Sequence, residues 1–307
     1  MNKTNTAKAS PLGRLEGLPD FENYLLNKQY STRTIQEHIA NAKRLEQWQR
    51  ENNFINELTY NELLTYVSYL QSRKLKPQSI NIQLHSITVY YEYLKEYNYI
   101  ITNPAKTLRV KGAAKAVTVN VLSDAELQNT YQAYVQFKNN TVPKNKTEQQ
   151  HQYTNTRNIA LLGLLIYQGL NTSELGKLQI KDIDLYKGVI YLNGAKRINA
   201  RILKLEPVQI LPLSMYLNSL KSTQEPLCKE NISNTVSRML QELKGINQKV
   251  STVYQIRASV IIHWLKLYGK RKTQYLIGHR YISSTEKYEV QNIDGLTDLL
   301  KKYHPFG

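Results

Sequence analysis

The segment LIGHRYISSTEKY, Leu276–Tyr288, is the most informative stretch of the chain. It contains a Gly-His pair at Gly278-His279, and Tyr288 follows His279 by nine positions. A Gly-His pair alone is a weak signal because it occurs in many unrelated sequences. The order and spacing of the segments that precede it decide how much weight it carries.

Three segments precede this stretch: GLNTSEL (Gly169–Leu175), YLNGAKRINARILKL (Tyr191–Leu205) and VYQIRAS (Val253–Ser259). The first predicts a short helix-turn after a buried helix over Ile159–Tyr167. The second predicts a hairpin with Gly194 in its turn. We expect short strands over Leu185–Leu192, Arg201–Leu205 and Val208–Leu211.

The N-terminal part of the chain has helical patterns. Ser31 is an N-cap candidate before an apolar stripe at helical spacing, a second helix is expected from Tyr60, and a third from Lys76-Pro77 to Asn103-Pro104. We expect a flexible arm at 1–14, a helical domain at 15–108, a linker at 109–121 and a second domain at 122–307.

Further signals lie in the second domain. Ser123 and Glu126 match the capping-box pattern of a helix start. The polar stretch Lys138–Thr154 predicts a loop, and helices are expected to resume near Asn231.

The charge balance predicts a polyanionic partner. Lys and Arg total 41 against 24 Asp and Glu, a net charge of +17, and both the N-terminal and C-terminal parts are basic. Nucleic acid is the first expectation and an anionic membrane face is the rival. A generally basic surface without a specific partner is the third interpretation.

Several function classes lack their signatures. Cys228 is the only cysteine, which excludes an internal disulfide and a zinc site built on several cysteines. The six histidines show no metal spacing and no HExxH, and neither a phosphate-binding GxxxxGK[ST] loop nor a dinucleotide fingerprint occurs. We expect no metal and no cofactor. The apolar stretch Ile159–Leu170 is too short for a membrane span and the N-terminus lacks a signal sequence, so a cytoplasmic protein is expected.

In this order and spacing, the segments resemble the tyrosine recombinase (phage integrase) family. Residues 31–49 and 75–105 resemble its helical core-binding domain, and the rest of the chain resembles its catalytic domain. The resemblance implies a mainly α fold with a small β-sheet. An all-α, SAM-like core-binding domain would precede an α+β catalytic domain.

The resemblance also implies a chemistry. A tyrosine hydroxyl attacks a DNA phosphodiester, forms a 3′-phosphotyrosyl link and frees a 5′-hydroxyl. The link conserves the bond energy, so neither ATP nor a metal is required. Cations must stabilise the charge on the phosphorane-like transition state, and a proton donor must serve the leaving oxygen.

The family roles transfer to matching positions. Tyr288 aligns with the nucleophile, Arg257 with the second catalytic arginine and His279 with the histidine of the Gly-His box. Lys196 aligns with the hairpin lysine that acts as general acid. Arg197 is the alternative, because the sequence fixes hairpin register poorly.

Two positions depart from the family pattern. Asn171 stands where the family normally has its first catalytic arginine, and Tyr254 stands where it has His or Lys. Asparagine brings no charge, and losing one charged contact in the transition state costs about a hundredfold in rate. Glu174 matches the family's structural acidic position. The candidates for compensating charge are Arg157, Lys177 and Arg197.

The partners follow from the same resemblance. A homotetramer on two DNA duplexes is implied, with Ile293–Tyr303 as the amphipathic segment donated to a neighbouring subunit, and with a partner recombinase or a directionality factor as accessories. Bound to DNA, the protein would be nucleoid-associated, and a mobile element is one suitable setting. Two alternatives stay open: a non-cleaving DNA-binding factor on the same scaffold, and an enzyme like the type IB topoisomerases.

Overall fold

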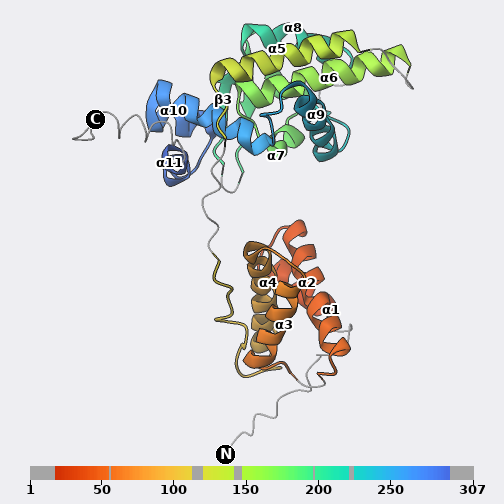
Figure 1. The fold of residues 1–307 in the computed structure, drawn as a ribbon, viewed down its shortest axis with the longest axis vertical. Coiled ribbons are helices and arrows are strands. Elements are labelled where there is room, and N and C mark those ends of the chain that lie inside the picture. Colours follow the sequence, from red (N-terminus) through yellow and green to blue (C-terminus); the bar gives the residue numbers. More distant parts are fainter. Residues whose placement is uncertain are drawn as a thin grey trace, which may run out of the picture. The chain divides into compact units, whose positions relative to one another are not determined.

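The computed structural model describes residues 18–54, 57–112, 120–141, 147–195, 198–220 and 225–290. The chain divides into two compact units, residues 1–117 and 118–307, each with its own apolar core. Both units are mainly helical and the second contains a small sheet, so the predicted fold class is confirmed (Figure 1). No helix in the described ranges is long and apolar enough to cross a membrane.

Within its described residues, the first unit contains four α-helices: α1 (Leu18–Asn27), α2 (Thr32–Glu51), α3 (Tyr60–Ser72) and α4 (Pro77–Glu96). Helix α2 packs against α1 and α4, and α3 packs against α4. The predicted cap at Ser31 is confirmed, since its hydroxyl accepts a hydrogen bond from the Thr34 amide at 3.3 Å. The predicted arm at 1–14 and residues 113–119 of the predicted linker lie outside the described residues.

The third predicted helix is shorter than expected. It ends at Glu96, not at Asn103-Pro104. Asn98 adopts a left-handed conformation with φ of 60°, and the Tyr99 amide donates back to the Leu94 carbonyl at 2.8 Å. Asn98 therefore takes the left-handed position that glycine usually occupies at the end of a helix.

The second unit combines seven α-helices, one short 3-10 helix (Ile180–Asp182) and one antiparallel sheet in the described ranges. The helices are α5 (Asp124–Asn140), α6 (Glu148–Tyr167), α7 (Thr172–Lys177), α8 (Pro207–Asn218), α9 (Ile232–Ile246), α10 (Val253–Ile277) and α11 (Ser283–Val290). The sheet order is β1 (Ile183–Asp184), β2 (Val189–Leu192), β3 (Arg201–Lys204). Helix α6 packs against α5, α8 and α10, and its apolar second half is buried as predicted.

Local start signals were predicted well in this unit. Ser123 and Glu126 form both hydrogen bonds of a capping box, and Asn231 caps α9. The hairpin is also confirmed, because β2 and β3 pair from Val189↔Lys204 to Leu192↔Arg201.

Three predictions in this unit were wrong. The loop expected over Lys138–Thr154 is largely helical: α5 continues to Asn140 and α6 begins at Glu148, capped by Thr147. Val208–Leu211 is not a strand but part of α8, which starts with a proline at its first position, where no amide is needed. The strand expected over Leu185–Leu192 is reduced to β2, because residues 185–188 form a turn that ends in Gly188 at φ of 63°.

Candidate functional site

A buried cluster of three charged side chains forms the base of the site. Glu174 on α7 accepts hydrogen bonds from Arg201 Nη2 at 2.7 Å and from Arg257 Nη1 at 2.9 Å, through different carboxylate oxygens. Both arginine residues are buried. Strand β3 and helix α10, far apart in the sequence, are therefore joined by one carboxylate.

Each guanidinium is also fixed by backbone carbonyls. Arg257 donates to the carbonyls of Gly169 and Ile277, and Arg201 Nε donates to the Leu276 carbonyl at 2.8 Å. Such planar, multiply bonded guanidinium groups are held rigidly, which favours electrostatic preorganisation.

Asn171 is the N-cap of α7 and takes no part in binding these cations. Its side-chain oxygen accepts from the Glu174 amide at 2.9 Å, while its own amide donates to Glu174 Oε2 at 3.0 Å. This capping box fixes the first turn of α7 and orients the carboxylate toward the two arginines. The residue that replaces the expected arginine thus has a structural role.

The Gly-His pair closes the end of α10 against the hairpin. Gly278 is left-handed, with φ of 77°, and its carbonyl accepts from the Asn199 amide at 2.8 Å. Ile198 forms a β-bridge with His279. A Cβ on residue 278 would lie 2.5 Å from Arg201 Nη1, so both the backbone angle and the arginine beneath it require glycine here.

Helix α11 places Tyr288 against His279. The two rings stack with their centroids 6.0 Å apart and an interplanar angle of 16°. His279 Nδ1 lies 2.9 Å from the Thr285 hydroxyl, one turn before Tyr288 on the same helix. The Tyr254 ring, from the start of α10, lies 6.4 Å from the Tyr288 ring.

Burial shifts the pKa values of both His279 and Tyr288. Desolvation, with smaller contributions from Arg257 and Arg201, lowers the pKa of His279 to about 4. Desolvation and Tyr254 raise the pKa of Tyr288 to about 12, although Arg257 opposes this shift. At neutral pH the imidazole is therefore uncharged and the phenol keeps its proton.

We expect His279 to titrate near pH 4 in the free protein, which histidine NMR would measure. Because its pKa is lowered from 6.5, the unfolded state takes up the proton first, and the free energy of unfolding should decrease as the pH falls from about 6.5 toward 4. Urea unfolding of wild type and His279→Gln would isolate this contribution. A difference between the two that does not change over this pH range would contradict it.

The structure brings together most of the residues predicted from sequence. Arg257, His279, Tyr288 and Tyr254 form one site, and Asn171 is linked to it through Glu174. Lys196 and Arg197 lie outside the described residues.

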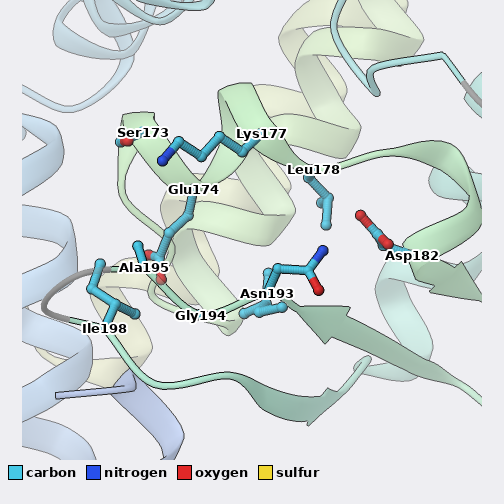
Figure 2. Close-up of a pocket in the computed structure, with 10 residues that line it drawn as sticks. Ser173, Glu174, Lys177, Leu178, Asp182, Asn193, Gly194, Ala195 and Ile198 are labelled. Carbon is cyan, nitrogen blue, oxygen red and sulfur yellow. The ribbon is translucent and has the colours of Figure 1, made fainter. Parts of the chain in front are cut away.

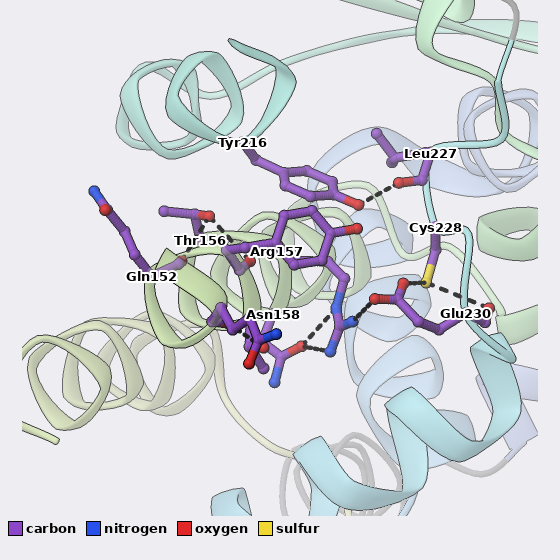
Figure 3. A network of polar contacts seen from close by, with 11 residues as sticks. Gln152, Thr156, Arg157, Asn158, Tyr216, Leu227, Cys228 and Glu230 are labelled. Atoms are coloured by element: carbon purple, nitrogen blue, oxygen red, sulfur yellow. Dashed lines mark hydrogen bonds and ion pairs between the residues drawn. The ribbon is translucent and has the colours of Figure 1, made fainter. Parts of the chain in front are cut away.

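Lys177 and Arg157, two of the candidates for compensating charge, have neighbours other than the arginines of this cluster. Lys177 lines a small cavity with Glu174, between α7 and the start of the hairpin (Figure 2). Arg157 on α6 bonds to Asn158 and Glu230 in a separate network (Figure 3). Its described hydrogen bonds reach none of the site residues.

Arg201 was missed by the sequence prediction. It lies in the alternating strand RILK, whose burial pattern places Arg201 and Leu203 inward and Ile202 and Lys204 outward. A charged residue in phase with the apolar positions of a strand was the signal that could have identified it. In the described parts of the chain, no group of three or more His, Cys, Asp or Glu residues could hold a metal ion.

Comparisons with known proteins agree with this geometry. Residues 18–101 match the model of the phage integrase N-terminal SAM-like domain. Tyrosine recombinase XerC of Bacillus subtilis (strain 168) is 22% identical over 304 residues, which cover 93% of this chain and 95% of the relative. XerC of Staphylococcus aureus (strain NCTC 8325 / PS 47) is 22% identical over 296 residues, covering 91% and 93%. By these comparisons the chain is similar to the tyrosine recombinases, and residues 18–101 match their SAM-like domain.

Solved structures of recombinases share the fold. The XerH site-specific recombinase bound to a palindromic difH substrate has a TM-score of 0.63 at 15% identity, over 86% of this chain and 78% of that one. The lambda integrase dimer bound to a COC′ core site has a TM-score of 0.62 at 14% identity, over 89% and 76%.

Proposed function

We propose that this protein cleaves and rejoins DNA at specific sites through a 3′-phosphotyrosyl intermediate; the relatives that it resembles are named tyrosine recombinases. The observation that supports it most is the stacking of Tyr288 on a neutral His279, beside the buried Arg257 guanidinium. Nucleophile, proton acceptor and cation come from α11, the Gly-His turn and α10.

The proposed reaction assigns each group a step. The Tyr288 oxygen attacks the phosphorus in line, the P–O bond to tyrosine forms and the bond to the 5′-oxygen breaks. Because the pKa of Tyr288 is raised to about 12, its proton must be accepted during the attack, and His279, whose imidazole is uncharged at neutral pH and stacks on the Tyr288 ring, is the proposed acceptor. Arg257 stabilises the negative charge that develops on the phosphoryl oxygens.

The leaving 5′-oxygen needs a proton donor from the hairpin. Lys196 is the proposed donor and Arg197 is the alternative. In the sequence they stand between Ala195 and Ile198, and the Ala195 amide donates a hydrogen bond to the Ile198 carbonyl at 2.7 Å. Ile198, the described residue that follows them, also forms a β-bridge with His279.

A non-cleaving DNA-binding factor is the second candidate. Asn171 favours it, because both the amide oxygen and the backbone amide of this residue are used by the capping box and supply no charge to a phosphate. Such a factor would occupy a recombination site and assist an active partner recombinase.

Covalent capture separates the two candidates. Purified protein is incubated with nicked duplexes from the DNA that flanks its own gene, and denaturing gels detect a protein–DNA adduct while footprinting detects binding. An adduct supports the recombinase. A clear footprint without an adduct, also when a partner recombinase is added, overturns cleavage and supports the factor.

DNA affinity should decrease steeply with salt. With +17 net charge we expect six or more phosphate contacts, and thus a loss of about a thousandfold in affinity between about 50 and 200 mM salt. Fluorescence anisotropy with a labelled duplex measures this slope. A loss of less than about tenfold would contradict an extensive charged interface.

We further propose that the active form is a homotetramer on two duplexes, with Ile293–Tyr303 donated to a neighbouring subunit. This segment lies outside the described residues. Sedimentation of the protein–DNA complex, with and without residues 291–307, tests the proposal: a tetramer that persists after truncation excludes this segment as the connection.

A further inference from the structure

The buried cluster beneath the Gly-His turn carries more positive than negative charge. Arg201 and Arg257 share the single carboxylate of Glu174, and the side chain of Arg201 is 0% exposed. Burying a charge without a partner of its own is unfavourable. An apolar residue at position 201 would fit the inward-facing pattern of β3 and leave a balanced Glu174–Arg257 pair.

Arg201 also has an unused donor. Its Nη1 is buried and has no hydrogen-bond partner among the described residues, although Nε and Nη2 are both bonded. Nη1 lies directly under the backbone of Gly278, which has no side chain in the way. The surplus charge is therefore held immediately below the turn that carries His279.

We propose that Arg201 is a positioning residue that supplies, from below the Gly-His turn, the positive charge that Asn171 does not provide. It does not touch the phosphate. It acts through the fixed position of Arg257, which shares its carboxylate, and through the positive field that it adds below the site, where negative charge develops on the phosphoryl oxygens. This inference rests on the proposed strand-cleavage function.

The first test compares Arg201→Met with Lys204→Met, which removes an exposed cation from the same strand. Arg201→Met should reduce the rate of adduct formation on a nicked duplex by at least about tenfold and change DNA affinity less than about twofold. Lys204→Met should leave the rate unchanged. Equal rates for wild type and Arg201→Met, with both folded, overturn the proposal.

A conservative variant separates charge from shape. Arg201→Lys keeps the positive charge but lacks the planar fork that bonds Leu276 and Glu174 together. It should keep most of the adduct rate that Arg201→Met loses. Equal losses in the two variants would assign Arg201 a purely structural role and overturn the inference.

Asn171→Arg provides a test by rescue. In the wild-type background it should give no gain, because the charge is already supplied. In the Arg201→Met background, Asn171→Arg should raise the rate of adduct formation at least about threefold. Such non-additivity indicates coupling between the two positions. If Asn171→Arg changes the rate of adduct formation equally in both backgrounds, Arg201 does not supply the charge that an arginine at position 171 would supply.

A readout without DNA distinguishes failure of this inference from failure of the proposed function. The charged groups that face His279 are Arg257, Arg201 and Glu174. Removing Arg201 should raise the pKa of His279 measured by NMR, whereas Lys204→Met should not. If wild type forms no adduct but this pKa shift occurs, the electrostatic role stands and cleavage fails; if the shift is absent, the role of Arg201 fails.

Discussion

Replacing Tyr288 by phenylalanine should reduce the covalent DNA adduct by at least about a thousandfold and leave DNA affinity within about twofold of wild type. The ring that stacks on His279 is retained in this variant, so the packing of α11 is preserved. Only the hydroxyl that would form the bond to phosphorus is lost. The measurement is adduct formation on a nicked duplex, followed with time on denaturing gels.

Tyr281→Phe is the matched control, because Tyr281 is exposed and lies in the turn before α11. This variant should form adduct at the wild-type rate. Adduct that survives in Tyr288→Phe would remove Tyr288 as the nucleophile, whereas loss in both variants would indicate a general defect of this turn.

Replacing Glu174 by glutamine should destabilise the second unit by about 3–5 kcal/mol, the largest stability effect that we expect from a single change. The amide is nearly isosteric but uncharged, so two buried guanidinium groups lose their common counter-ion. The orientation of the carboxylate by the Asn171 capping box would be weakened as well. Urea unfolding followed by circular dichroism measures the change.

Glu286→Gln is the control for this experiment. Its carboxylate pairs with Lys270 at 3.9 Å and is 45% exposed, so the expected effect is below about 0.5 kcal/mol. A loss below about 1 kcal/mol for Glu174→Gln would show that the arginines do not depend on this carboxylate. Glu174→Gln combined with Arg201→Met should recover part of the stability, since one buried cation is removed.

Helix starts were predictable because their signals are local. The Ser31 and Ser123 caps need only a hydroxyl at the right distance from the first turn, and both are confirmed. Helix ends were less predictable: α4 ends through Asn98 in a left-handed conformation, which asparagine adopts without the usual glycine. The polar stretch that begins α6 was mistaken for a loop because an exposed helical turn has no apolar period.

In the candidate site, too, some residues were predictable from the sequence and others were not. Tyr288, Arg257 and His279 were predicted from the resemblance to the tyrosine recombinases, and the structure places them together. Arg201 was not predicted: the alternating pattern of β3 indicates that it points inward, but its hydrogen bond to the Leu276 carbonyl joins residues far apart in the sequence and is not contained in that pattern. The role of Asn171 as a helix cap was likewise visible only once α7 had a defined first residue.

The hydrogen bond from Asn199 to Gly278 and the bridge between Ile198 and His279 join the hairpin to the Gly-His turn. The described end of the hairpin and the turn that carries His279 are therefore one hydrogen-bonded piece of backbone. A displacement of Ile198 or Asn199 would carry His279 with it. A force applied to this end of the hairpin would thus change the position of the proposed proton acceptor.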